Sequence, residues 1–159
     1  MNLCLIYRIV EASEALLEAA IPRTYGHLRR YYEAHLEEER GHLSMIETDL
    51  TGFEIPRIHL AAQLAGSQYY LIRHDHPALL LGYMHCLEKR APAEEFIERF
   101  ERELDRPMTF LRHHGIADVK HEKELVAEIE KHPADIQKLI AWNEAACDAI
   151  VNQLTVEFK

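Results

Sequence analysis

Residues 113–125 have the sequence HHGIADVKHEKEL, in which three polar side chains recur at the spacing of an α-helix. His114, Asp118 and His121 are separated by four and three residues, so a continuous helix places all three on one face. The residues between them are small or aliphatic, apart from one lysine. We therefore predict a helix here, and the partners of its polar face must come from elsewhere in the chain.

Length and composition predict one globular domain over residues 1–159. The chain has 48% hydrophobic residues and only 6 glycines and 6 prolines, which is enough apolar material for one core. Its net charge of −9 argues against nucleic acid or an anionic membrane as a partner, because phosphate binding depends on clustered lysine and arginine. We expect a small-molecule ligand instead.

The cysteines and the N-terminal residues indicate the compartment. Cys4, Cys86 and Cys147 are odd in number and far apart, so they form neither a disulfide framework nor a CxxC metal site. Arg8 and Glu11 interrupt the first apolar stretch, which is therefore predicted to be a helix of the domain rather than a signal peptide or membrane span. These features favour the reducing cytoplasm.

Apolar periodicity and proline positions predict an all-α bundle of about seven or eight helices. An amphipathic first helix ends at Pro22, and we predict that the second runs unbroken from about residue 23 to about residue 50. A third is expected over residues 57–73. The remaining helices are predicted to start at Pro77, Pro92, Pro107 and Pro133. No stretch alternates like a strand of useful length.

The second predicted helix contains HLEEERGH, residues 35–42. His35, Glu39 and His42 lie at steps of four and three, on the stripe that also carries the apolar side chains of this helix. A carboxylate and two imidazoles would then face the core, where an unpaired charge is costly unless a metal or hydrogen bonds compensate it. An acid followed three residues later by histidine lets adjacent helical turns bind one ion.

The fourth predicted helix adds another carboxylate, because Glu88 shares a face with Leu81 and Met84. Three carboxylates and three imidazoles suit a pair of iron or manganese ions better than a structural zinc, which prefers cysteine and histidine. A lone acid-x-x-His pair also occurs by chance in many helices. The candidate ligands are Glu39, His42, Glu88, His114, Asp118 and His121.

The other polar residues have simpler interpretations. Glu37 and Glu38 are expected on a solvated face, although Glu38 is also within reach of a metal at His42. Five other histidines have simple interpretations, His74 and His76 as helix-end or capping residues and His27, His59 and His132 as surface residues. Cys86 and Cys147 are expected in the core.

HLEEERGH, AGSQYYLIRHDHPALLLGYMHCLE and HHGIADVKHEKEL, in this order, resemble the haem-oxygenase-like diiron oxidases and oxygenases over most of residues 5–125. The resemblance implies a haem-oxygenase-like bundle in which the six candidate residues bind two irons, the second weakly. It also implies that dioxygen oxidises a small organic acid, amino acid or amine. The chain begins at what resembles the family's second helix, so we expect the first to be absent or supplied by a partner. The sequence leaves open whether the protein forms a homodimer.

Two rival functions fit the same residues. A metal-free enzyme of the same fold, resembling thiaminase-like or pyrroloquinoline-quinone-forming proteins, would use the acids and histidines for acid–base chemistry. A non-enzymatic helical binding module would use them as a hydrogen-bonded core. Metal analysis of the purified protein distinguishes these from the diiron enzyme.

Overall fold

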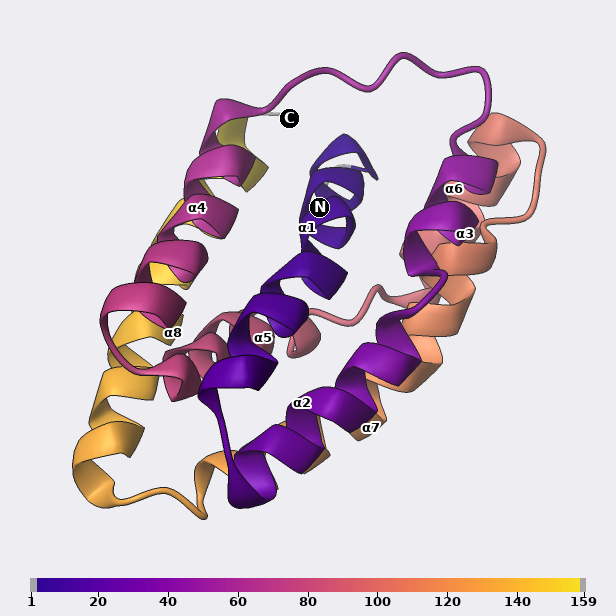
Figure 1. The fold of residues 1–159 in the computed structure, drawn as a ribbon. Helices are drawn as coiled ribbons and strands as arrows, with labels where there is room; N and C mark the ends of the chain where they lie inside the picture. Colours follow the sequence, from indigo (N-terminus) through magenta and orange to yellow (C-terminus); the bar gives the residue numbers. More distant parts are fainter. Residues whose placement is uncertain (1–2, 158–159) are drawn as a thin grey trace.

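The structure, a computed structural model, describes residues 3–157, apart from the side chains of residues 118, 119 and 154–157. All regular elements in this range are helical (Figure 1), which confirms the predicted all-α class with seven or eight helices. The elements are α1 (Leu3–Ala20), η1 (Ile21–Arg23), α2 (Gly26–Glu39), α3 (His42–Asp49), α4 (His59–His74), η2 (Pro77–Leu79), α5 (Leu80–Glu88), α6 (Glu94–Leu104), α7 (Thr109–Ile129) and α8 (Ala134–Glu157).

The prolines mark helix boundaries as predicted. Pro22 lies in η1 and ends α1, and Pro77 opens the short turn η2 that leads into α5. Pro92, Pro107 and Pro133 each precede the next α-helix by one or two residues. Proline suits these positions because its fixed φ fits a helix start and its missing N–H removes no hydrogen bond there.

The prediction of one unbroken helix over residues 23–50 is wrong, because the chain breaks into α2 and α3 at Gly41. This glycine has φ of 90°, in the left-handed region that other residues rarely adopt. The amide of Arg40 still donates to the Leu36 carbonyl, and the amide of Met45 donates to the Gly41 carbonyl. Each helix therefore keeps its own hydrogen bonds, and the change of direction is confined to Arg40, whose ψ is 125°, and Gly41.

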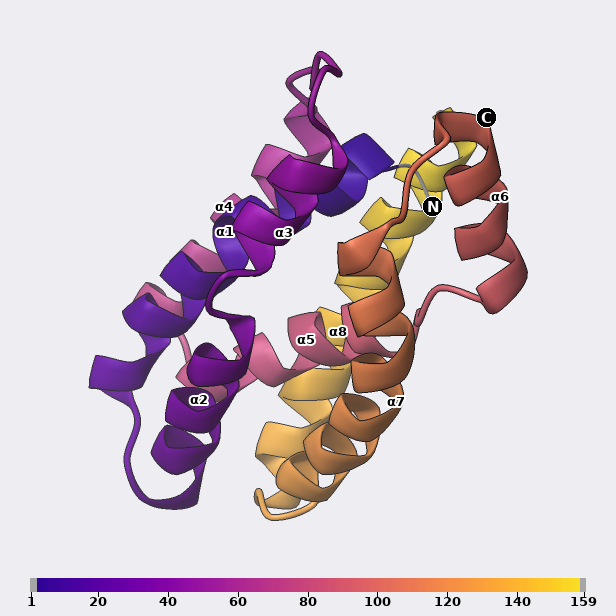
Figure 2. The same ribbon diagram turned by 90° about the vertical axis from the view of Figure 1, so that its right-hand side faces the viewer.

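The helices form two groups with α5 between them. Figure 2 shows α1 to α4 on one side and α6 to α8 on the other, and α5 crosses the space that separates them. Contacts of α5 with α4, α7 and α8 agree with this view. Most side chains of α5 are buried, as expected for a helix surrounded by others. No helix within residues 3–157 is both long and apolar enough to cross a membrane.

Two hydrophobic clusters form most of the core. One contains the C-terminal part of α1 together with buried residues of α2, α4, α5, α7 and α8, and includes Leu16, Tyr32 and Leu125. The other contains the N-terminal part of α1 with residues of α3, α6 and α7, and includes Ile6 and Leu111. Because α1 and α7 contribute to both clusters, the interior between the two lies along the middle of these helices.

The crossing of α5 and α8 depends on Gly82. A Cβ atom at this position would lie 2.3 Å from the carbonyl oxygen of Ile140 and 2.9 Å from the amide nitrogen of Glu144, both in α8. Backbone atoms cannot yield as a side chain can, so the two helices approach this closely only with glycine at position 82.

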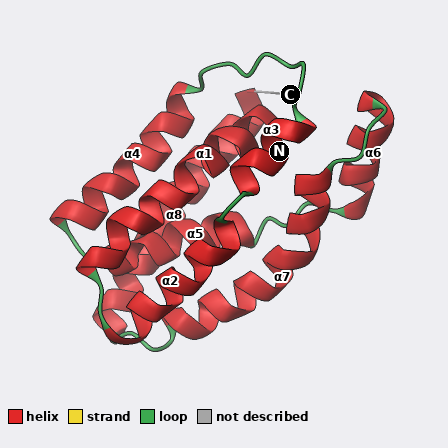
Figure 3. Cartoon of the chain, turned by 45° about the vertical axis from the view of Figure 1, so that its right-hand side comes forward, coloured by secondary structure: helices red, strands yellow, loops and turns green. Residues whose placement is uncertain are grey.

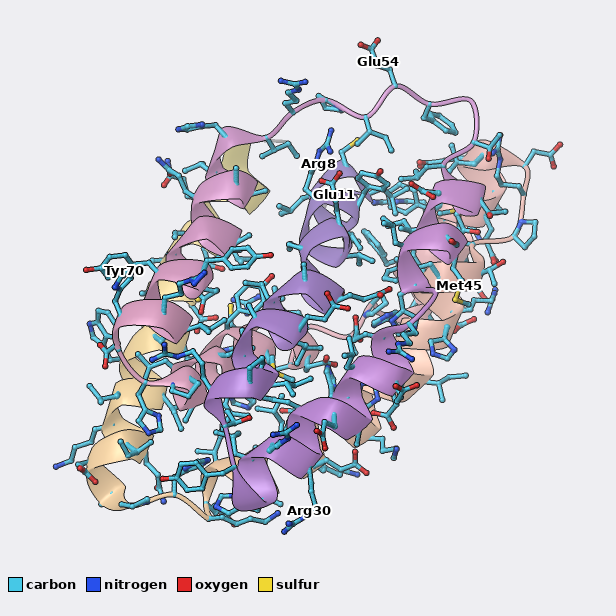
Figure 4. All side chains as sticks on the ribbon, in the orientation of Figure 1. Arg8, Glu11, Arg30, Met45, Glu54 and Tyr70 are labelled. Atoms are coloured by element: carbon cyan, nitrogen blue, oxygen red, sulfur yellow. The ribbon has the colours of Figure 1, made fainter. Side chains whose placement is uncertain are left out.

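The connection between α3 and α4, drawn as a loop in Figure 3, is held against α1 by Arg8, which Figure 4 labels. Its guanidinium donates to the backbone carbonyls of Ile55 and Pro56, each at 3.1 Å, and pairs with the Glu11 carboxylate at 2.9 Å. One side chain therefore fixes a connection that has no regular secondary structure over residues 53–58.

We expect Gly82→Ala to lower the free energy of unfolding by about 1–3 kcal/mol, the usual cost of overpacking a helix crossing. Gly66→Ala is the matched control, because Gly66 is an exposed residue of α4 with no atom near its missing Cβ. The control should gain up to about 1 kcal/mol from helix propensity. Urea unfolding followed by circular dichroism measures both, and equal stability of the two variants would contradict the close crossing.

Candidate metal centre

The start of α7 is anchored by a buried carboxylate. Asp49, at the end of α3, accepts a hydrogen bond from the backbone amide of Phe110 at 2.8 Å, and only 3% of Asp49 is exposed. The first amides of a helix lack partners within the helix and attract negative charge, so this carboxylate satisfies one of them. It also fixes α7 relative to α3, and thereby sets the position of His114 relative to His42.

The helix predicted over residues 113–125 is confirmed as part of α7, which is continuous over Thr109–Ile129. His114 and His121 both lie on the side of α7 that meets α2, α3 and α5, as their spacing predicts. The side chain of Asp118 lies outside the described residues, so its proposed role as a ligand stays a prediction from the sequence.

Glu39, His42 and His114 form the first of two polar groups, which we call the Glu39 group. Nδ1 of His42 lies 3.3 Å from Oε1 of Glu39 and 3.2 Å from Nε2 of His114. The His114 ring packs at 4.3 Å, between centroids, against the buried ring of Phe110. Glu39 and His42 were predicted on one helix. They lie on α2 and α3 instead, but they remain in contact across the break at Gly41.

His35, Glu88 and His121 form the second group, called the Glu88 group. The Glu88 carboxylate lies between the two imidazoles, with Oε1 3.6 Å from Nε2 of His35 and Oε2 3.4 Å from Nδ1 of His121. All three residues are buried. His35 was predicted on the same stripe as Glu39 but not among the candidate ligands.

The two groups are adjacent and together form what we call the centre. Nε2 of His35 lies 3.8 Å from Oε1 of Glu39, so the first group continues into the second. Within each group, one potential ligand atom from every residue lies within 4.8 Å of the others. Five of the six predicted ligands therefore converge from four helices, with His35 as an added member.

Glu39 and His35 have the protonation states that bind metal ions. Burial raises the pKa of the Glu39 carboxyl, but the hydrogen bond from His42 and the neighbouring imidazoles outweigh burial and lower it. Burial also lowers the pKa of His35, so its imidazole is uncharged at neutral pH. Metal ions bind carboxylates and neutral imidazoles, and these side chains need not lose a proton first.

Exposure distinguishes Glu39 from Glu38, the two acids between which the sequence could not choose. The Glu39 side chain is 7% exposed and belongs to the centre, whereas Glu38 is 40% exposed. Glu38 pairs with Lys120 at 3.2 Å, and its other oxygen lies 3.4 Å from Nε2 of His121. It therefore lies at the rim, and Glu39 is the better candidate ligand.

The histidines outside the centre only partly follow their predicted roles. His76 is a cap, as predicted, because its Nδ1 accepts a hydrogen bond from the amide of Ala78. His59 is exposed, as predicted. His27 and His132 were interpreted as isolated surface residues, and this is wrong: both are half-buried beside the carboxylate of Glu128.

A cavity of about 100 Å³ borders the centre. His35, Glu39, Glu88 and His114 contribute to its wall, and the remaining lining is mostly apolar and comes from α1, α5 and α7. Tyr83 contributes to this lining, and its hydroxyl is buried and has no hydrogen-bond partner among the described residues. Buried hydroxyls normally have a partner, so this one is unusual.

Comparison with known proteins adds no assignment. We found no significant match for the chain among protein-family models, curated proteins or solved structures. The function must therefore be argued from the centre and its cavity.

We expect Asp49→Ala to lower the free energy of unfolding by about 1–2 kcal/mol, because the buried amide of Phe110 loses its partner. Asp49→Asn should lose less, since an amide oxygen still accepts the bond. Glu98→Ala is the control, because Glu98 pairs with Arg102 at 3.5 Å on the surface of α6. This substitution should change the free energy of unfolding by less than about 0.5 kcal/mol. Urea unfolding of the three variants tests the anchor, which is refuted if Asp49→Ala is as stable as the control.

Proposed function

We propose that the protein is a non-haem diiron oxidase or oxygenase that uses dioxygen to oxidise a small organic acid, amino acid or amine. The observation that carries this proposal is the convergence of two adjacent groups, each containing one carboxylate and two imidazoles, inside a helical bundle. Buried ionisable groups in this number are costly unless something binds them, and they border a cavity.

The residues of the centre fit iron. A set of two histidines and one carboxylate with open positions is the arrangement typical of non-haem iron(II) oxygenases, and both groups have this composition. The three cysteines, which favour zinc or iron–sulfur clusters, are absent from both groups. In this proposal Glu39, His42 and His114 hold one ion, and His35, Glu88 and His121 hold the other, with Asp118 as an additional ligand expected from the sequence. Manganese suits the same ligands.

Iron(II) bound here would supply the electrons that reduce dioxygen, chemistry that the side chains themselves cannot perform. The chain's own contribution is to bind the substrate beside the centre and to exclude water from it. The apolar lining favours a substrate with an apolar body. We also propose the cytoplasm as the location, since a reducing compartment keeps iron in the iron(II) state.

Arg90 supports the organic-acid substrate class. It is the one arginine or lysine among the described residues that line the cavity. Its guanidinium pairs with Asp148 of α8 at 2.8 Å and donates to the Cys86 carbonyl. We propose that a substrate carboxylate in the cavity binds this side chain in competition with Asp148.

Iron content tests the proposal. After reconstitution with iron(II) under nitrogen, we expect the centre of the wild-type chain to hold about one to two irons, the upper value being the number of three-ligand groups in the centre. Glu39→Ala and Glu88→Ala should each hold less, because each removes the carboxylate of one group. Glu37→Ala is the matched control, since Glu37 is an exposed acid of α2 that pairs with Arg40 and belongs to neither group. Atomic absorption gives the counts.

The same samples distinguish the rival functions. A metal-free enzyme or a binding module would bind no iron, and Glu39→Ala would then lower only the melting temperature. Wild-type protein without iron, or equal iron in Glu39→Ala and Glu37→Ala, would refute the diiron centre. Asp118→Ala extends the series: we expect it to fold normally, since alanine is the better helix former, and to lose iron if Asp118 is a ligand.

A further inference from the structure

A third group of potential ligands lies away from the centre, where α2 begins and α7 ends. His27 is in the first turn of α2, Glu128 in the last turn of α7, and His132 in the connection to α8. These segments meet at one end of the bundle (Figure 1). One ligand atom from each of the three residues lies within 4.8 Å of the others.

The carboxylate of Glu128 is the fixed part of this group. Its side chain is 2% exposed, and Oε1 lies 2.5 Å from Nδ1 of His27. Oε2 is held by Lys131 at 2.7 Å, which orients the carboxylate so that the first oxygen faces the histidines. Lys131 is itself 53% exposed, so solvent screens its charge and its flexible side chain can move away from a cation.

The second histidine, His132, has a ring nitrogen that makes no hydrogen bond within the described part of the chain. The His132 ring lies 5.1 Å from the His27 ring, between centroids. Its Nε2 is buried and has no hydrogen-bond partner among the described residues. A buried ring nitrogen without a partner is unusual in a folded protein and points to a group that binds it. A hydrogen bond between His27 and Glu128 alone would not explain why this nitrogen of His132 is buried without a partner.

We propose that His27, Glu128 and His132 bind one divalent metal ion, with zinc as the best fit. Two imidazoles and one carboxylate form a common zinc ligand set that leaves a position open to water. Ligand atoms on a tetrahedral zinc stand about 3.4 Å apart, as follows from zinc–ligand distances near 2.1 Å. The ion would replace the hydrogen between His27 and Glu128 and would widen their 2.5 Å contact, which His27 can follow because its side chain is 42% exposed.

This site would tie together the two helices that carry most of the centre. His35 follows His27 on α2, and Glu128 follows His121 on α7, each by about two helical turns. An ion that joins the start of α2 to the end of α7 therefore fixes the spacing of these helices near the Glu88 group. The site is separate from the centre and does not depend on iron being bound there.

Zinc content decides the proposal. The full-length wild-type chain, His27→Ala and His132→Ala are freed of metal and dialysed to equilibrium against Zn²⁺ alone, with His59→Ala as the control for an exposed histidine outside any group. The centre is intact in all four proteins, so any zinc that it takes cancels in the difference. We expect His27→Ala and His132→Ala each to hold one zinc fewer than the wild type and the control.

The outcomes separate this proposal from the diiron function. Equal zinc in all four proteins overturns the site, and so does an equal loss in His59→Ala. Iron loading of the same variants should match the wild type, and if no variant binds iron, the diiron proposal fails while the zinc difference still decides this one. If either substitution prevents folding, the ring-nitrogen NMR signals of His27 and His132 in the wild-type chain serve instead. They must shift on addition of Zn²⁺, and unchanged signals overturn the site.

Discussion

Six ionisable side chains share the interior between α2, α3, α5 and α7, and the cost of burying them constrains the fold around them. Five are buried and His114 is half-buried. A carboxylate removed from water is tolerated only where positive or hydrogen-bonding groups surround it. Glu39 and Glu88 each face two imidazoles. The helices must therefore hold these residues together, because moving one helix away would leave a buried charge without compensation.

The contacts inside the centre are close but not tight. Three carboxylate-to-imidazole distances within the two groups are 3.3 Å, 3.6 Å and 3.4 Å, whereas strong charge-assisted hydrogen bonds are about 2.7–2.9 Å long. A divalent ion bound among these ligands would add to folding stability, because it would bind the folded chain in preference to the unfolded one. The Asp49 anchor and the close crossing at Gly82 matter for the same reason, since they fix where α7 and α5 present their ligands.

The sequence predicted the parts that depend on local spacing. His114 and His121 repeat with helical period on a stretch free of proline, and that helix is present. Glu88 was placed by the apolar neighbours on its own helix, Leu81 and Met84, which are buried with it. Proline positions located the helix starts because proline acts on its own and adjacent residues. In each case the determining interaction lies within one or two helical turns.

The parts that sequence reasoning missed depend on residues far apart in the chain. Gly41 was not recognised as a break because glycine is tolerated inside helices, and its left-handed φ goes with the packing of α3 on α1 and α7, which are distant from it in sequence. His35 was passed over because the ligand search followed acid-x-x-His pairs, although it lay on the predicted stripe. The hydrogen bond from Phe110 to Asp49 spans 61 residues, and no local pattern indicates it.

The left-handed residue between α2 and α3 also has a mechanical consequence. Glu39 and His35 move with one helix and His42 with the next, so rotation about the two backbone torsions of Gly41 changes the distance between them. Such a rotation breaks no hydrogen bond within either helix, because the ladders end on either side of the joint. A cofactor whose preferred ligand distances change with its oxidation state would therefore bind to two regular helices that are joined only through Arg40 and Gly41.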